Sequence, residues 1–405
     1  MKKTAKIFAA ISCVILGTAL VSCSKSSETK NSKSKDLIEL TVWESLDGPD
    51  EFIKQAALKY QESHPNISIK FVNVELGDAA GTIALDGPAD IGPDLFAAPH
   101  DKLGELVNGG HILATKNPEQ VKEMVISSCA QALTYKGVMY GYPVSAETYA
   151  LFYNKDLINE NEVPKTWEEL KTWASDFNSK NNEKRGFMMD VGSSYYTIIF
   201  TTSNGNRLFG ADGSDTSKTY INTPDSIRGM EFFQSLRSIL DVPAADLTTG
   251  TVDGAFQKGN SALHITGLWN VKNFENANLN FGVAPIPSLP GDKTPAASFS
   301  GTRAMYVSAY SYHPEEAADF AQFLLTDEMQ KLRFDLTGAM PSTSIEVDSP
   351  YIAGFLTQLS YSFPMPSIPE MATFWSAMDS ASRNIWNGAN VESELNACDK
   401  SILGK

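Results

Sequence analysis

The side chains best suited to chemistry in this chain of 405 residues are carboxylates and aromatic rings, because 48 residues are Asp or Glu and 10% are Phe, Trp or Tyr. Carboxylates accept hydrogen bonds from hydroxyl groups, and a pair placed across a glycosidic bond can hydrolyse it. Such a pair is defined by its separation in space, so a glycoside hydrolase stays open as an alternative. The motifs HExxH, GxSxG, Walker A and GxGxxG are absent, and the five histidines lack metal-ligand spacing. We therefore predict no catalytic residue, no metal site and no cofactor.

The overall charge argues against one class of partner and favours one class of ligand. The formal net charge is -15. Nucleic-acid binding requires clustered Lys and Arg, so no nucleic-acid partner is expected. A strongly acidic cleft repels anions, which favours a neutral ligand. The four cysteines are too few and too scattered for a disulfide framework or a cysteine-rich zinc site.

The N-terminus has the pattern of an export signal. Three lysines precede an apolar run from Ile7 to Leu20, which is too short to be read first as a membrane span, so we predict a signal peptide over residues 1–22. The run ends in Leu-Val-Ser-Cys, which resembles the bacterial lipobox and predicts lipidation of Cys23 and attachment to a membrane. Residues 23–36 are rich in Ser and Lys and predict a flexible tether.

The mature chain begins with alternating strand and helix patterns. Residues 38–43 are partly alternating and β-branched, and residues 67–71 alternate again. Between them, apolar residues from Phe52 to Tyr60 repeat at helical spacing, and residues 94–97 resemble a third, buried strand. This order predicts an α/β fold.

Further elements are expected along the rest of the chain. Thr166 and Glu169 have the spacing of a capping box and predict the start of a helix, with Trp167 in the core. Further helices are predicted at residues 224–240, 314–325 and 327–336, and short strands at residues 262–265 and 304–307.

The segment from Pro143 to Leu157 resembles the signature of extracellular solute-binding proteins of carbohydrate ABC importers, and Pro164–Leu170 follows at the family's usual distance. Similarity to maltose/maltodextrin-binding proteins continues through most of the mature chain. It includes Gly92–Phe96, His100–Lys102, Ala255–Gly259, Gly267–Trp269, Leu324–Glu328, Met365–Met371 and Phe374–Trp375.

This resemblance implies a two-lobed, periplasmic-binding-protein-like α/β fold, with hinge crossovers and a ligand cleft between the lobes. It places the crossovers near Ser145–Ala150, Gly282–Pro285 and Val347–Pro350. The N-terminal lobe would comprise residues 37–146 and 284–347, and the C-terminal lobe residues 147–283 and 348–405. A ligand that contacts both lobes would then drive their closure.

Sugars present hydroxyl groups and flat C–H faces, which suit carboxylates and aromatic rings. The resemblance implies ligand-binding roles for Ser45, Asp47, Asp101, Lys102, Glu147, Tyr195, Trp269 and Trp375. Asp47 follows the first strand, at the edge where open α/β sheets bind ligands, but it could equally cap the next helix. Lys102 stands where the family often has arginine, which keeps the charge and loses the bidentate fork.

Four positions depart from the maltodextrin pattern. Ala98 stands where an aromatic ring commonly stacks, and Ser193 replaces an acidic residue. Ser376 and Asp379 replace a tyrosine and an arginine. Several subsites therefore look thinned, and the resemblance implies an α-glucoside oligosaccharide whose length and identity stay open.

The sequence thus predicts a monomeric, lipid-anchored receptor of the cell envelope that faces the periplasm or exterior. It would capture maltose or maltooligosaccharides and deliver them to the transmembrane subunits of an ABC permease. Two alternatives stay open: the same receptor class for a different oligosaccharide or another solute, and a surface-anchored glycoside hydrolase.

Overall fold

The computed structural model describes residues 37–405. The predicted signal peptide, the lipidation site at Cys23 and the tether lie outside the described residues. No helix between residues 37 and 405 combines the length and the apolar composition that a membrane crossing requires.

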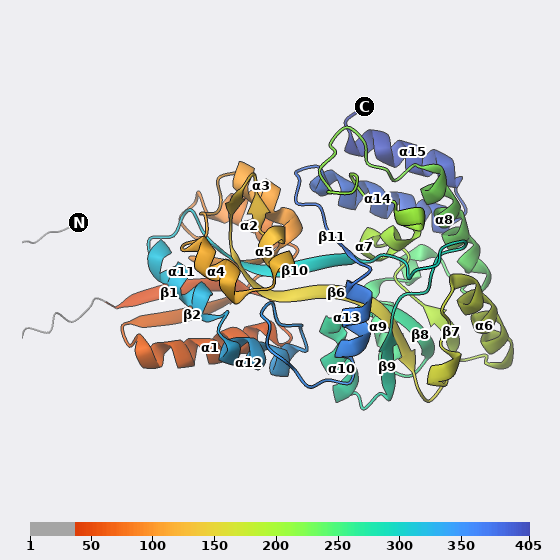
Figure 1. Cartoon of the computed structure of the whole chain (residues 1–405), viewed down its shortest axis with the longest axis horizontal. Helices are drawn as coiled ribbons and strands as arrows, with labels where there is room; N and C mark the ends of the chain where they lie inside the picture. The colour runs from red at the N-terminus through yellow and green to blue at the C-terminus, as the bar shows by residue number, and fades with distance from the viewer. Residues whose placement is uncertain (1–36) are drawn as a thin grey trace, which may run out of the picture. The chain divides into compact units, whose positions relative to one another are not determined.

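A mixed sheet of nine strands forms the centre of the described chain, in the order β2-β1-β3-β10-β6-β8-β7, with β11 beside β10 and β9 beside β6 (Figure 1). The strands are β1 (Ile38–Glu44), β2 (Ile67–Asn73), β3 (Leu95–Pro99), β6 (Tyr142–Asn154), β7 (Arg185–Met188), β8 (Ser261–Gly267), β9 (Phe281–Ala284), β10 (Phe299–Val307) and β11 (Phe363–Pro364). β1 is parallel to β2 and β3, whereas β10 is antiparallel to β3 and β6. A separate pair consists of β4 (Thr134–Tyr135) and β5 (Val138–Met139). The predicted α/β class is confirmed.

The N-terminal lobe is built on β1, β2 and β3. Its helices are α1 (Pro49–Ser63), α2 (Ala79–Asp86), η1 (His100–Lys102), α3 (Leu103–Asn108), α4 (Pro118–Met124), α5 (Ser127–Ala132), α11 (Pro314–Phe323) and α12 (Asp327–Thr337). Helix α1 begins after a tight turn in which Asp47 and Gly48 have φ values of 63° and 118°, and Pro49 fits the first helical position because its own φ is fixed. Helix α12 ends at Gly338, whose φ of 72° suits a helix C-terminus.

The C-terminal lobe surrounds the buried cluster that contains Tyr149 and Trp167. Its helices are η2 (Glu160–Glu162), α6 (Trp167–Lys180), α7 (Ser194–Thr197), η3 (Ile198–Thr201), η4 (Ser203–Gly205), α8 (Pro224–Ser235), η5 (Leu236–Ser238), η6 (Ala244–Asp246), α9 (Thr249–Gln257), η7 (Leu268–Asn270), α10 (Val271–Asn276), α13 (Ile352–Leu359), α14 (Met371–Trp386) and α15 (Val391–Ile402). Both bonds of the Thr166–Glu169 capping box are present, and Trp167 is fully buried, as predicted.

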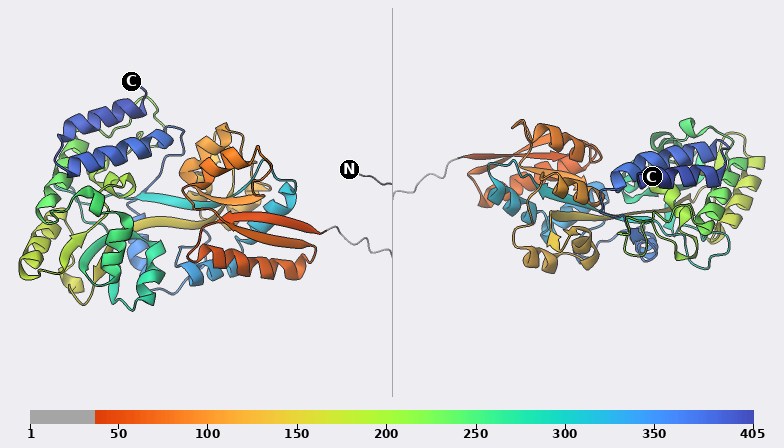
Figure 2. Two further views of the ribbon diagram at one scale, coloured as in Figure 1. Left: turned by 180° about the vertical axis from the view of Figure 1, so that it is seen from behind. Right: turned by 90° about the horizontal axis from the view of Figure 1, so that it is seen from above.

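Strands β6 and β10 run side by side from one lobe into the other (Figures 1 and 2). Along β6, Val144 belongs to the buried cluster of the N-terminal lobe and Tyr149 to that of the C-terminal lobe. Along β10, Phe299 belongs to the C-terminal cluster and Ala304 to the N-terminal one. Both strands therefore change cores within their own length.

The burial of residues after Gly282–Pro285 favours a later position for the second crossover than the one expected there. Ile286 and Leu289 are buried in the same cluster as Trp167, and β9 pairs with the far end of β6. We therefore propose that the chain crosses inside β10, between Phe299 and Ala304. The physical reason is that a residue belongs to the lobe with which its side chain is buried.

Candidate functional site

The crossing strands supply the first part of the candidate site. Ser145 lies opposite Arg303, and Glu147 lies opposite Gly301. Paired residues of an antiparallel sheet point to the same face, so Ser145, Glu147 and Arg303 share one. Ser145 Oγ donates a hydrogen bond to Glu147 Oε1 at 3.1 Å. The register shifts between Arg303 and Ala304, and such bulges re-aim side chains next to functional sites.

Three predicted ligand-binding aromatics from separate elements meet beside these strands. The ring of Tyr195 in α7 lies 6.0 Å from that of Trp269 in η7 and 6.5 Å from that of Trp375 in α14, measured between centroids. Phe299 of β10 lies 6.1 Å from Tyr195 and 5.8 Å from Trp375. Trp269 remains 37% exposed, which is high for a tryptophan. These rings form an apolar surface that a flat sugar face could cover.

The orientation of Tyr195 depends on the start of α7. Asp379 Oδ1 accepts hydrogen bonds from the backbone N of Ser194 at 2.7 Å and from its Oγ at 2.6 Å. Asp379 is one of the departures from the maltodextrin pattern, and here it fixes the helix that carries a site residue. Burial, followed by the neighbouring hydroxyl of Tyr149 and the carboxylate of Glu147, raises the pKa of Tyr195 well above its usual value. Its hydroxyl therefore stays protonated and can donate a hydrogen bond.

A hydrogen bond connects the two lobes directly within the candidate site. Trp375 Nε1 of the C-terminal lobe donates to Asp101 Oδ2 of the N-terminal lobe at 3.0 Å. Asp101 is only 5% exposed and lies in η1, directly after β3. The predicted hydroxyl acceptor and the predicted stacking ring are therefore direct neighbours.

The remaining predicted residues, Ser45, Asp47 and Lys102, differ in their burial and in their partners. Ser45, at the end of β1, is 8% exposed, and its Oγ accepts a hydrogen bond from Arg303 Nη2 at 2.6 Å. Asp47 is exposed, and the N-cap of α1 is Gly48, whose backbone N–H donates to Asp50 Oδ1 at 3.2 Å, so the capping alternative for Asp47 is wrong. Lys102 Nζ lies 3.8 Å from Glu105 Oε2. The structure thus links Asp101, Tyr195, Trp269 and Trp375 through a hydrogen bond and ring contacts, and it places Glu147 and Ser45 beside Ser145 and Arg303 of the crossing strands. Among residues 37–405, Asp47 and Lys102 form no hydrogen bond to these side chains.

Sequence reasoning missed a buried charge cluster beside Ser45. Arg303 Nε donates to Glu44 Oε2 at 3.2 Å, and its Nη2 also bonds Glu44 Oε1. Arg333 of α12 approaches Glu44 Oε2 from Nη1 at 3.9 Å. Glu44, Arg303 and Arg333 are 0%, 8% and 2% exposed. The signal available in the sequence was a charged residue next to buried apolar residues in each of two strands, Glu44 at the end of β1 and Arg303 within β10, since buried charges need partners.

The arginines differ in their surroundings. Burial, and then the positive charge of Arg303, lower the pKa of Arg333 to about 10, so it remains charged at neutral pH. Arg333 Nε and Nη1 are fully buried without a hydrogen-bond partner. The residues 37–405 contain no group of three or more His, Cys, Asp or Glu side chains placed to hold a metal ion.

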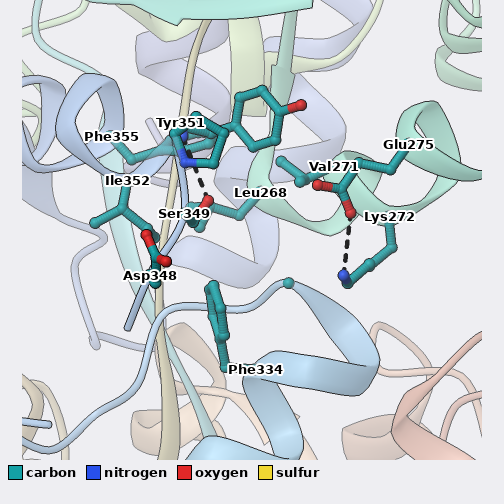
Figure 3. A pocket seen from close by; sticks show the side chains of 12 residues that line it. Leu268, Val271, Lys272, Glu275, Phe334, Asp348, Ser349, Tyr351, Ile352 and Phe355 are labelled. Carbon is teal, nitrogen blue, oxygen red and sulfur yellow. Dashed lines mark hydrogen bonds and ion pairs between the residues drawn. The ribbon is translucent and has the colours of Figure 1, made fainter. Parts of the chain in front are cut away.

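Two cavities lie apart from the grouped residues. A crevice of about 60 Å³ separates Phe334 of α12 from Leu268 of η7 and Val271 of α10, and the pair formed by Lys272 Nζ and Glu275 Oε2 at 3.0 Å borders it (Figure 3). A larger cavity of about 730 Å³ is lined by Tyr153 and other residues of the C-terminal lobe. Neither includes a predicted ligand-binding residue, so the candidate site rests on the grouped side chains.

Comparison with known proteins gives one family and several relatives. Residues 43–331 match the family described as "Bacterial extracellular solute-binding protein". The "Galactooligosaccharide-binding protein" of Bacillus subtilis (strain 168) is 31% identical, over 100% of this chain and 98% of the relative. The "Maltodextrin-binding protein MdxE" of the same organism is 27% identical, over 93% of this chain and 91% of the relative.

Solved structures agree with these relatives. A cyclo/maltodextrin-binding protein complexed with maltotetraose has a TM-score of 0.77 and 33% identity, covering 91% of this chain and 98% of its own. The Thermus thermophilus maltotriose-binding protein bound with maltotriose has a TM-score of 0.82 and 27% identity, covering 90% and 99%. The predicted resemblance and the two-lobed fold are confirmed. Because the family and the relatives are binding proteins, the prediction of a non-enzyme is confirmed and the hydrolase alternative is excluded.

Proposed function

The chain belongs to the bacterial extracellular solute-binding proteins, and from that premise we propose that it captures maltose or maltooligosaccharides between its lobes and delivers them to the transmembrane subunits of an ABC permease. Within the family it is a sugar-binding ABC-transporter protein of the maltodextrin type. The observation that carries the proposal is the meeting of Tyr195, Trp269 and Trp375 with the carboxylates of Asp101 and Glu147.

The chemistry of this group matches that of a neutral sugar. The aromatic rings offer apolar faces for the C–H side of a pyranose. Asp101 and Glu147 are acceptors, and they stand on the N-terminal lobe and on the crossing strand β6. A sugar bound to both groups would contact both lobes, and such differential contact is what shifts a two-lobed protein toward its closed state.

A galactooligosaccharide is a second candidate ligand. The relative that binds galactooligosaccharides aligns with the whole chain at 31% identity. In addition, Ala98 is a fully buried methyl group where maltodextrin-binding proteins commonly place a stacking ring. The absence of a ring at position 98 is compatible with a galactooligosaccharide that stacks elsewhere, and equally with a maltooligosaccharide that has fewer sugar units.

Isothermal titration calorimetry with maltose, maltotriose, a galactotriose and spermidine tests the proposal. We expect saturable, one-to-one binding of at least one maltooligosaccharide, with the sugar recovered intact by chromatography. Binding of galactotriose alone would transfer the proposal to the second candidate. Binding of spermidine and of no sugar would refute both.

We also propose that Cys23 carries a lipid anchor that holds the monomeric receptor at the cell envelope. The observation is the Leu-Val-Ser-Cys motif that ends the apolar run. Cells that express Cys23→Ser should release the protein from membrane pellets into the soluble fraction. Equal pelleting of the two forms would contradict the anchor.

A further inference from the structure

The guanidinium of Arg303 is held on two of its three nitrogens. Nε and Nη2 bond the two carboxylate oxygens of Glu44, and Nη2 also donates to Ser45 Oγ at 2.6 Å. In the part of the chain that the structure describes, Nη1 has no protein acceptor, yet it is not one of the fully buried unpaired nitrogens. The side chain is 10% exposed. Nη1 is therefore a fixed donor that keeps contact with solvent.

Arg303 lies on a strand beside the grouped ligand-binding residues. Arg303 lies opposite Ser145 on the face that also carries Glu147, and diagonal neighbours on one face of a sheet are within reach of long side chains. Burial lowers the pKa of Arg303, but the carboxylate of Glu44, and after it that of Glu147, outweigh this and raise the pKa above its usual value. On the adjacent strand, Pro99 pairs with Arg303 and precedes η1, which carries Asp101.

Of these charged side chains, Arg303 is a hydrogen-bond donor only, whereas Asp101 and Glu147 are acceptors only. A sugar hydroxyl does both, so carboxylates alone leave its oxygen lone pairs without a partner, and the hydroxyl of Tyr195 adds only a neutral donor. A desolvated hydroxyl oxygen that lacks a donor lowers affinity, and a preorganised charged donor corrects this without further loss of side-chain freedom.

We propose that Arg303 is a specificity-determining residue of this site. Its Nη1 donates to one hydroxyl oxygen of the bound oligosaccharide, and Glu44 acts as a positioning residue that fixes the guanidinium. The proposal rests on the proposed sugar capture and adds to it which group selects the sugar. Arg333 contacts the same carboxylate but has its unpaired nitrogens fully buried, so it cannot reach a ligand.

The experiment measures the Kd of the sugar that binds wild type most tightly, together with a series of its monodeoxy derivatives. A hydrogen bond to a charged group predicts that Arg303→Met weakens the parent sugar by about 10- to 100-fold. The derivative that lacks the contacted hydroxyl should bind wild type and Arg303→Met almost equally. Both changes remove the same hydrogen bond, so their effects on the binding free energy do not add. Glu44→Gln should also raise the Kd of the parent sugar, to a smaller extent, and should change the Kd of that same deoxy derivative least.

Arg333→Met is the matched control, because it also removes a buried guanidinium from Glu44. It should lower thermal stability and leave the pattern across the deoxy series unchanged. If Arg303→Met does not fold, Arg303→Lys replaces it, since lysine keeps the charge and loses the fork. A folded Arg303 variant with the wild-type Kd, or an Arg333→Met variant with the same altered pattern, would overturn the proposal. Failure of wild type to bind any sugar would instead refute the proposed function.

Discussion

The indole of Trp375 allows the sharpest test of the candidate site, because two different contributions can be separated. Its ring packs at 5.8 Å from Phe299 and 6.5 Å from Tyr195, which makes it part of the apolar surface. Its Nε1 donates to Asp101 Oδ2 at 3.0 Å and so joins the lobes. Trp375→Ala removes both contributions, whereas Trp375→Phe keeps a ring and removes only the donor.

The expected magnitudes differ between the two variants. Loss of a stacking ring and its apolar burial costs about 1 to 3 kcal/mol, so Trp375→Ala should raise Kd by about 5- to 150-fold. In the sugar complex a hydroxyl can replace the indole as donor to Asp101, so Trp375→Phe should cost less than about 1 kcal/mol, or about 5-fold in Kd.

Calorimetric titration of the sugar, with thermal unfolding of each variant, measures these effects. Trp173→Ala is a suitable control, because Trp173 stacks on Phe177 within α6 at 5.1 Å and belongs to no part of the candidate site. It should leave Kd unchanged. Equal losses in Trp375→Phe and Trp375→Ala would show that the hydrogen bond, and not the ring, carries binding. An unchanged Kd in a folded Trp375→Ala would show that the ring is structural.

Three further predictions follow from individual contacts. Trp269→Ala should raise Kd by about 5-fold or more through lost stacking, with little change in melting temperature because the ring is 37% exposed; a large drop in melting temperature would contradict this. Asp379→Ala should release the start of α7 and lower stability by about 1 kcal/mol, and it should weaken sugar binding through Tyr195, whereas an unchanged Kd would remove that link. Burial raises the pKa of Cys129 to about 11 and of Cys398 to about 12, so both thiols stay protonated at pH 8. In folded protein expressed without residues 1–23, which removes Cys13 and Cys23, a colorimetric thiol reagent should therefore modify neither, and in denaturant it should modify both; rapid reaction of the folded protein would contradict their burial.

Local features of the chain were predictable because their causes are local. The capping box of Thr166 and Glu169 uses residues three apart, and both of its bonds form. The end of α12 at Gly338 depends on a backbone angle that glycine adopts readily. In the same way, the burial of Trp167 followed from helical periodicity alone.

The candidate site was predictable only through resemblance. Tyr195, Trp269 and Trp375 lie on three separate elements, and no spacing in the sequence indicates that their rings meet. Departures from the family pattern were harder to interpret, since Asp379 looked like a lost ligand contact and instead holds the first residue of α7. Substitution at a site residue can thus indicate a new structural partner as well as a lost subsite.

The sequence by itself determined the class of the protein, because the α/β pattern, the segment from Pro143 to Leu157 and the acidic and aromatic side chains are all readable in order along the chain. Only the tertiary structure decided which charges share a site. Glu44 and Arg303 are 259 residues apart, and Asp101 and Trp375 are 274 apart. Hydrogen bonds act over about 3 Å, so these partners become visible only once the crossing strands and the facing lobes bring them together.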